Sequence, residues 1–341
     1  MKYVFTSMIA LMTSFATLPA YAEQFNTGSA KVSIDDPHGT RDLDGFVWYP
    51  THETRTKIKH GNKVWQGIEV AQDAAISDGK FPLLILSHGM FGHAMNQAWL
   101  AKAMTEQGYI VAAINHPGTS FFADDPDDRR ELWLRPRDIT RVIDDLLVDE
   151  NFASHVDLDR IYAAGHSLGG MTVLQLAGAK YDALTHQSAC DQNPEGLVCS
   201  ILNEWNIGKT PQDIAALSQD LTDPRIRAIV SLDMGGAQVF SDQSLAALTT
   251  PTLIYAAPAG HVDMDKNSRL LKAKMPTNTV TYLEPTGYTH FDFMGLCTEK
   301  GLDILKKFEP QDVEVCIDGR DIRTTKHRDV VKTITSFFDG L

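Results

Sequence analysis

The stretch RIYAAGHSLGGMTVLQLAGA, residues 160–179, contains the pattern that decides the fold. Its first six residues are a short apolar run typical of a buried β-strand, and residues 168–179 follow as a predicted helix. Between them, residues 165–169 read Gly-His-Ser-Leu-Gly, which matches the motif G-x-S-x-G. In this context the motif predicts a sharp strand-to-helix turn with Ser167 at its apex.

Such a turn would make Ser167 a nucleophile. The strained backbone lifts the hydroxyl clear of the sheet, and the glycines at 165 and 169 let neighbouring backbone approach without a Cβ clash. The N–H groups at the start of the next helix face any negative charge that develops there. A serine hydroxyl attacks poorly until a base takes its proton, so the chain must also provide a base and an acid that orients it.

In folds with this turn the base comes last in chain order, after the acid. His290 follows the last predicted strand, in the turn-rich segment GYTHFDFMGLC, and is the predicted base. His261 comes too early in the chain. His327 begins the closing helix, where we expect it to face solvent.

Two aspartates are candidates for the acid that orients this histidine. Asp233 ends the predicted strand AIVSLD, whereas Asp263 lies several residues beyond the end of the following strand. Either strand end could bring a carboxylate to His290 and hold the imidazole in the correct tautomer. We favour Asp233, because a residue fixed on a rigid element holds its geometry better, and we keep Asp263 as the alternative.

An oxyanion hole requires two backbone N–H donors. One is expected at Leu168, directly after the nucleophile, and the other in a loop that follows an earlier strand. The segment SHGMFGH, residues 87–93, is that loop, and Met90 after His88-Gly89 is the expected second donor.

Apolar runs and helical patterns alternate along the chain, which predicts one α/β domain with a mostly parallel sheet and helices on both faces. The runs that predict strands are residues 46–50, 81–89, 109–115, 160–165, 225–233, 251–257 and 279–284. The pattern changes at about 181–224, which we interpret as a lid-like insertion over the sheet within a single domain at 23–341. A loop is expected from Cys190 to Cys199, and a helix capped by Thr210 is expected to follow it.

The N-terminus predicts export. Lys2, a short apolar stretch and Ala20-Tyr21-Ala22 describe a secretory signal peptide at residues 1–22, so we expect a periplasmic or secreted protein with no stable membrane span after cleavage. The net charge of −13 argues against nucleic acid as a partner. The sequence does not indicate an oligomeric state.

All four cysteines lie in the exported part, where an oxidising compartment favours disulfides. Three pairings are possible, and pairing between sequence neighbours gives Cys190–Cys199 and Cys297–Cys316. The chain has no C-x-x-C spacing, and the segment DMDKNS (263–268) departs from a calcium loop, so we expect no metal and no organic cofactor.

Seven segments together resemble a known family: DGFVWYP, SHGMFG, INHPG, LRPRDITRVIDDLL, GHSLGG, HFDFMGLCTEKG and CIDGRDIRTTKHRDVV. The chain resembles the predicted dienelactone hydrolases of the α/β-hydrolase fold, which are related to the platelet-activating-factor acetylhydrolases. The resemblance implies Ser167 as nucleophile, His290 as base and Met90 with Leu168 as oxyanion donors. The chain departs from this family at Ala259-Gly260, the place where many members have their acid. The acetylhydrolases instead resemble the segment SLDMGG, with the acid at the position of Asp233. True dienelactone hydrolases use a cysteine nucleophile, so the family name does not fix the substrate.

These observations predict an exported serine hydrolase of the carboxylesterase or acetylhydrolase type (EC 3.1.1.-). It would cleave small-molecule esters with short to medium acyl groups through an acyl-enzyme, with a possible role in lipid degradation. An amidase or peptidase with the same triad is the alternative, since sequence cannot separate the two leaving groups. A non-catalytic binding protein that kept the fold is a further alternative.

Overall fold

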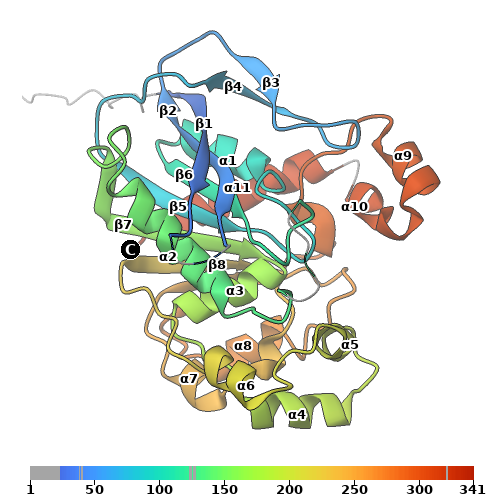
Figure 1. Ribbon diagram of the computed structural model, residues 1–341. Helices are drawn as coiled ribbons and strands as arrows, with labels where there is room; N and C mark the ends of the chain where they lie inside the picture. Colours follow the sequence, from blue (N-terminus) through green and yellow to red (C-terminus); the bar gives the residue numbers. More distant parts are fainter. Residues whose placement is uncertain (1–23, 38, 40, 123–124, 126–127, 320–321) are drawn as a thin grey trace, which may run out of the picture.

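The computed structural model describes residues 24–37, 39, 41–122, 125, 128–319 and 322–341 (Figure 1). The predicted signal peptide, residues 1–22, lies outside the described residues. None of the helices in the described part of the chain combines the length and apolar character needed to cross a bilayer.

Strands from both halves of the chain join in one sheet. They are β1 (Asn26–Ile34), β2 (Leu43–Thr51), β3 (Lys57–Lys59), β4 (Ile68–Gln72), β5 (Phe81–Ser87), β6 (Ile110–Asn115), β7 (Val156–His166), β8 (Ile226–Leu232), β9 (Thr252–Tyr255) and β10 (Val280–Leu283). Their order across the sheet is β10-β9-β8-β7-β5-β6-β2-β1-β4-β3. From β6 to β10 all neighbours are parallel, while β2 is antiparallel to both β1 and β6. The mostly parallel sheet predicted from the apolar runs is therefore confirmed.

Helices cover both faces of this sheet. The α-helices are α1 (Ala98–Glu106), α2 (Leu134–Leu146), α3 (Leu168–Leu176), α4 (Ala183–Gln192), α5 (Leu197–Glu204), α6 (Pro211–Leu217), α7 (Asp242–Ala246), α8 (Ser268–Lys274), α9 (Gly301–Phe308), α10 (Glu314–Ile317) and α11 (Arg323–Asp339). Short 3₁₀ helices are η1 (Ala237–Val239), η2 (His290–Phe293) and η3 (Pro310–Asp312). Figure 1 shows α4, α5 and α6 grouped at the end of the molecule far from β3 and β4.

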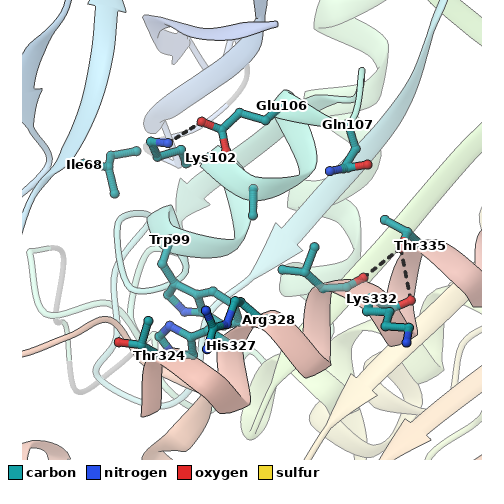
Figure 2. A pocket seen from close by; sticks show the side chains of 12 residues that line it. Ile68, Trp99, Lys102, Glu106, Gln107, Thr324, His327, Arg328, Lys332 and Thr335 are labelled. Carbon is teal, nitrogen blue, oxygen red and sulfur yellow. Dashed lines mark hydrogen bonds and ion pairs between the residues drawn. The ribbon is translucent and has the colours of Figure 1, made fainter. Parts of the chain in front are cut away.

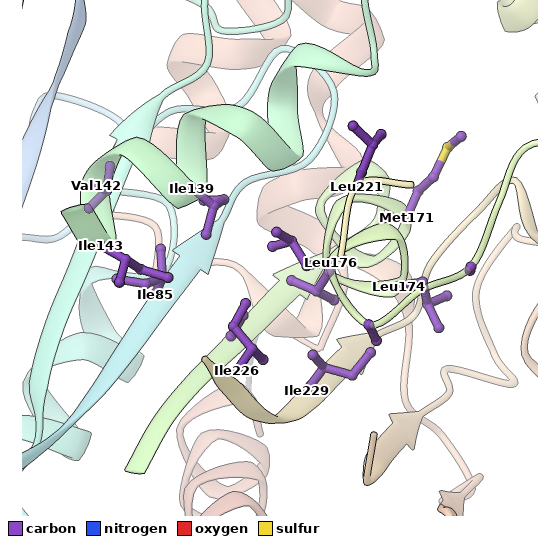
Figure 3. Close-up of a cluster of buried hydrophobic side chains, with 14 of the residues drawn as sticks. Ile85, Ile139, Val142, Ile143, Met171, Leu174, Leu176, Leu221, Ile226 and Ile229 are labelled. Atoms are coloured by element: carbon purple, nitrogen blue, oxygen red, sulfur yellow. The ribbon is translucent and has the colours of Figure 1, made fainter. Parts of the chain in front are cut away.

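The two faces follow from the alternation of side chains along each strand. In β5, Leu83 and Ile85 enter a cluster with α2 and α3, whereas Leu84 and Leu86 enter a second cluster with α1 and α11. Figure 3 shows the first cluster, where Ile85 lies among side chains of α2. A strand buried on both faces must be apolar at every position, which is why β5 forms a continuous apolar run.

Parallel pairing brings four strand ends to one edge of the sheet. Ser87 at the end of β5 pairs with Gly165 of β7, His166 of β7 pairs with Leu232 of β8, and Leu232 pairs with Tyr255 of β9. Loops that leave these strands therefore meet at the same place. In open α/β sheets this edge is where ligands bind.

The structure corrects two details of the sequence interpretation. The N-terminal strands β1, β3 and β4 were not expected, because they lack a continuous apolar run. The segment from Cys190 to Cys199 is not a loop throughout: Cys190 lies in α4 and Cys199 in α5, and only residues 193–196 connect the helices. Thr210 caps α6 as expected, since its side chain accepts a hydrogen bond from the Asp213 N–H at 3.1 Å.

Candidate active site

Ser167 lies at the turn between β7 and α3, and its backbone is strained. Its φ of 55° and ψ of −120° lie in a region that residues with a side chain seldom occupy. The turn is held in place because the Ser167 N–H donates to the carbonyl oxygen of Leu232 at 3.0 Å. Such strain persists only where the surroundings enforce it, and it is concentrated at functional sites.

The glycines of the motif are required by close backbone approach. A Cβ at Gly165 would lie 2.0 Å from the carbonyl oxygen of Gly169, and a Cβ at Gly169 would lie 2.0 Å from that of Ser87. Both contacts are with backbone atoms, which cannot move aside without shifting a strand. Only glycine therefore fits on either side of the serine turn.

Asp233 follows β8 directly and is fully buried. Its carboxylate has two partners: Oδ2 lies 2.6 Å from His290 Nδ1, and Oδ1 accepts the Ala257 N–H at 3.0 Å. Its own N–H donates to the Tyr255 carbonyl oxygen at 2.8 Å. The carboxylate is thus fixed against the imidazole by the ends of β8 and β9.

Asp263, the alternative acid, lies elsewhere. Its side chain is half exposed, and Oδ1 accepts the N–H groups of Asp265 at 3.0 Å and Lys266 at 3.2 Å. These bonds shape a local turn. Among the described residues, the structure brings Asp233 and not Asp263 into contact with His290.

His290 begins η2 and is buried beside the serine turn. His166, the residue before Ser167, donates from Nε2 to the carbonyl oxygen of His290 at 2.8 Å, and the two rings lie 4.6 Å apart. Because a carboxylate can only accept, Nδ1 of His290 carries the proton that Asp233 binds. The other nitrogen, Nε2, then keeps its lone pair.

Burial sets the protonation states of this pair. Burial raises the pKa of Asp233 to about 6. Burial, with His261 nearby, lowers the pKa of His290 to about 3. At neutral pH the aspartate is therefore charged and the imidazole is neutral, which is the state in which a histidine can act as a base.

A buried ion pair fixes the segment that carries His290. Asp292 is fully buried, and its Oδ2 lies 2.5 Å from Lys326 Nζ of α11. The same carboxylate oxygen accepts the backbone N–H of Thr289 at 2.7 Å. Our sequence interpretation missed these two charged residues, although both lie in the distinctive segments HFDFMGLC and IRTTKHRDVV. Because the two residues lie more than thirty positions apart, no local sequence pattern indicates that they form an ion pair.

His327 does not face solvent as expected. It is buried, its ring stacks on Trp99 at 3.5 Å, and its Nε2 lies 3.0 Å from the carbonyl oxygens of Asp292 and Met294. These hydrogen bonds fix the segment that follows His290 against α11. The expectation was wrong because a helix start says nothing about which neighbours cover it.

A surface hollow of about 550 Å³ lies on this side of the molecule, between α1 and α11 (Figure 2). Trp99, His327 and the aliphatic parts of Lys102 and Lys332 line it. It contains none of the residues predicted for catalysis. Ser167, His290 and Asp233 lie instead near the edge where β7, β8 and β9 end.

The backbone N–H groups of Met90 and Leu168 are the two expected oxyanion donors. Within the described part of the chain, neither Met90 nor Leu168 donates its backbone N–H in a hydrogen bond. Leu168 is the first residue of α3, and Met90 follows the end of β5. The structure thus places both beside the strand ends from which Ser167 emerges.

Both disulfides of neighbouring cysteines form in the structure. Cys190–Cys199 joins α4 to α5, and Cys297–Cys316 joins the segment after η2 to α10. Among the residues that the structure describes, no group of three or more His, Cys, Asp or Glu side chains could hold a metal ion.

Part of the chain matches a known family and enzymes with known activities. A family model described as "Serine aminopeptidase, S33" matches residues 80–190, which is less than half of the chain. Cutinase est2 of Thermobifida alba is 28% identical over 133 residues, 38% of this chain and 37% of the cutinase. A bis(hydroxyethyl) terephthalate hydrolase of Streptomyces coelicolor is 28% identical over 139 residues, 41% of this chain and 38% of that hydrolase. The chain thus matches well under half of the length of these relatives.

A solved structure resembles the whole chain. The ferulic acid esterase of Streptomyces cinnamoneus has a TM-score of 0.60 and 19% identity, over 94% of this chain and 91% of the esterase. This likeness and the family model establish the α/β-hydrolase fold. None of the relatives named here is a dienelactone hydrolase or an acetylhydrolase, so that narrower resemblance stays a prediction.

Proposed function

We propose that this protein is an exported serine hydrolase that cleaves carboxylic esters with Ser167, His290 and Asp233. One observation carries the proposal. The fully buried carboxylate of Asp233 lies 2.6 Å from the imidazole of His290. The backbone of His290 is in turn hydrogen-bonded to His166, the residue before the strained Ser167. Acyl transfer by a serine nucleophile gives a role to each of these groups: the serine attacks, the histidine takes its proton and the aspartate orients the histidine.

The reaction would proceed through an acyl-enzyme. Nε2 of His290 takes the proton of Ser167 as its oxygen attacks the ester carbonyl, and Asp233 stabilises the imidazolium that forms. The N–H groups of Met90 and Leu168 bind the oxyanion. His290 then protonates the leaving alcohol, and water releases the acyl group with His290 as base again.

The serine and the histidine are not yet hydrogen-bonded. Within the described residues, Ser167 Oγ makes no hydrogen bond to His290. Catalytic hydrogen bonds are often long before substrate binds and tighten in the complex. The two residues are held together through their neighbours. His166, next to Ser167, donates a hydrogen bond to the backbone of His290. Leu232, next to Asp233, accepts a hydrogen bond from the backbone N–H of Ser167.

We also propose that the insertion at 181–224 roofs the substrate site. Its Trp205 lies 5.6 Å from the ring of Phe91, which follows Met90, and the Arg129 guanidinium lies 4.8 Å from the Phe91 ring. On another side, Val198 of α5 packs against the loop after Asp233. An insertion in contact with both loops would select the acyl or alcohol group.

Export is supported by two features. The predicted signal peptide precedes the mature chain, and both disulfides would persist only in an oxidising compartment. We propose a periplasmic or secreted enzyme. Its relationship to acetylhydrolases and a role in lipid degradation are part of this proposal.

Esters are the preferred substrate class because the similar proteins are a cutinase, a bis(hydroxyethyl) terephthalate hydrolase and a ferulic acid esterase. The match to a serine aminopeptidase model favours a second candidate, an amidase or peptidase with the same residues. An amine leaves less readily than an alcohol and needs more effective protonation. Turnover of matched substrates therefore separates the two.

The mature protein should be assayed with p-nitrophenyl acetate and butyrate, with matched anilides and with a fluorophosphonate probe. We expect ester turnover that exceeds anilide turnover, and labelling that Ser167→Ala abolishes. Higher anilide turnover would favour the peptidase. Absence of both labelling and turnover would indicate a binding protein and end the hydrolytic proposal.

A further inference from the structure

The loop after β5 contains a histidine that the mechanism above does not use. His88 is buried, and both of its ring nitrogens bind backbone. Nδ1 donates to the carbonyl oxygen of Gly89 at 2.7 Å, and Nε2 accepts the N–H of His116 at 3.1 Å. Since a carbonyl only accepts and an N–H only donates, these two bonds fix one neutral tautomer.

The bond to Gly89 determines where the next N–H points. The carbonyl of Gly89 and the N–H of Met90 belong to one peptide group, and the described chain contains no cis peptide bond. In a planar trans peptide these two groups point in opposite directions. His88 Nδ1 at 2.7 Å and the Gly92 N–H at 3.1 Å hold the carbonyl on one side, so the Met90 N–H is directed to the other.

The serine turn lies against this loop. A Cβ built on Gly89 would lie 3.1 Å from Cβ of Ser167, so the loop and the serine are in direct contact. The Met90 N–H has no acceptor among the described residues and is available to a charge that develops beside Ser167.

A buried charged network fixes His88 in turn. Arg135 of α2 is almost fully buried, and its guanidinium donates to the carbonyl oxygen of His88, to Ser87 Oγ at 3.2 Å and to Thr119 Oγ1 at 2.5 Å. Burial, with Arg135 and His116 nearby, keeps the pKa of His88 well below its usual range. The imidazole therefore stays neutral and keeps its acceptor for the His116 N–H.

We propose that His88 is a positioning residue that aims the Met90 N–H into the oxyanion hole through its bond to the Gly89 carbonyl. This proposal rests on the proposed function. It assigns to the side chain of His88 a part of the transition-state stabilisation that is otherwise credited to backbone alone. Without the Nδ1 bond, the one hydrogen bond that the described residues still make to the Gly89–Met90 peptide is from the Gly92 N–H to the Gly89 carbonyl oxygen.

Two substitutions each keep one of the two ring hydrogen bonds of His88 and remove the other. The amide nitrogen of asparagine takes the place of Nδ1, so His88→Asn keeps the donor to Gly89. The amide of glutamine reaches the place of Nε2, so His88→Gln keeps a partner for the His116 N–H and loses the donor to Gly89. A role in packing alone would make the two variants similar.

Turnover should be measured on p-nitrophenyl butyrate per serine titrated with a fluorophosphonate, so that unfolded molecules do not count. Losing one oxyanion donor costs about 10²–10³ in turnover, and we expect His88→Gln to lower kcat by about 10²-fold with KM within about twofold. Binding of a trifluoromethyl ketone, which forms the oxyanion, should weaken by a similar factor of about 10². His88→Asn should keep kcat within about fivefold of the unaltered protein.

His60→Gln is the matched control. His60 is half-buried, and burial lowers its pKa to about 4, but its Nε2 lies 2.9 Å from Ser29 Oγ of β1, far from the strand ends that meet at Ser167. We expect this variant to keep its kcat.

The inference is overturned if His88→Gln keeps its kcat, or if His88→Asn and His88→Gln lose activity equally. It is also overturned if kcat falls while ketone binding is unchanged. An unaltered protein that neither hydrolyses the ester nor reacts with the fluorophosphonate would instead overturn the proposed function itself.

Discussion

Replacing Asp233 by asparagine should lower kcat by about 10³- to 10⁴-fold and leave the fold intact. Oδ1 of Asp233 accepts the Ala257 N–H at 3.0 Å, whereas Oδ2 faces His290 Nδ1 at 2.6 Å. An asparagine would keep its carbonyl oxygen on Ala257 and turn its NH₂ group towards Nδ1. The imidazole must then carry its proton on Nε2, where it can no longer take the proton of Ser167.

The magnitude has two parts. The lost attraction between a carboxylate and an imidazolium with charge centres about 4 Å apart is about 4 kcal/mol at an effective dielectric constant of about 20. At about 1.4 kcal/mol per decade this corresponds to about 10³ in rate. The wrong tautomer adds to it, and the same substitution in serine proteases costs about 10⁴.

The assay is kcat on p-nitrophenyl butyrate per titrated serine, with a thermal melt to confirm folding. Asp263→Asn is the control, because this half-exposed carboxylate binds two backbone N–H groups of its own turn and the exposed ammonium group of Lys266, and does not contact His290. We expect the control to keep kcat within about twofold, in line with the small effects of exposed sites. Loss of activity in Asp263→Asn with retention in Asp233→Asn would refute the assignment of the acid.

Three further outcomes are expected. Because burial raises the pKa of Asp233 to about 6, kcat/KM should fall as the pH drops below about 6 and the carboxylate is protonated; an acid limb near pH 4 would contradict the assignment. Lys326→Met removes the nearer of two cations that pair with the buried carboxylate of Asp292, the other being Arg323, whose Nε lies 3.9 Å from Oδ1. We expect it to cost about 3–5 kcal/mol in the free energy of unfolding by urea, whereas Lys332→Met on the exposed side of α11 should change it little; equal effects would argue against the ion pair. Reduction of both disulfides, which span 9 and 19 positions, should cost about 3 kcal/mol each and lower Tm, and an unchanged Tm would show that they do not constrain the unfolded chain.

The sequence pattern was sufficient to predict a structural feature where the residues that form the feature are neighbours in the chain. The strand, the serine turn and the helix of residues 160–179 follow from an apolar run, two glycines and a helical segment, and the structure has each of them. The same is true of the cap at Thr210, where the side chain bonds an N–H three positions on.

Pattern failed where burial comes from distant parts of the chain. His327 was expected to face solvent at the start of the closing helix, yet it lies in the second turn of α11, Trp99 of α1 stacks on it and the segment after His290 accepts its hydrogen bonds. The segment from Cys190 to Cys199 contains proline and glycine and was expected to be a loop, but most of it is helical and a disulfide joins the two helices. In both cases tertiary contacts outweigh local preference.

The sequence by itself determined the strained serine turn, because the strand, the turn and the helix follow one another in one short segment and the motif has glycine two residues before and two residues after the serine. It also limited the choice of base to a histidine that follows the last strand. Only the tertiary structure decided that Asp233 rather than Asp263 faces His290, and that the side chain of His88 bonds the carbonyl oxygen of Gly89. The parallel register of β7, β8 and β9 brings residues 166, 232 and 255 into line, and no local pattern records the distance between side chains that such a register creates.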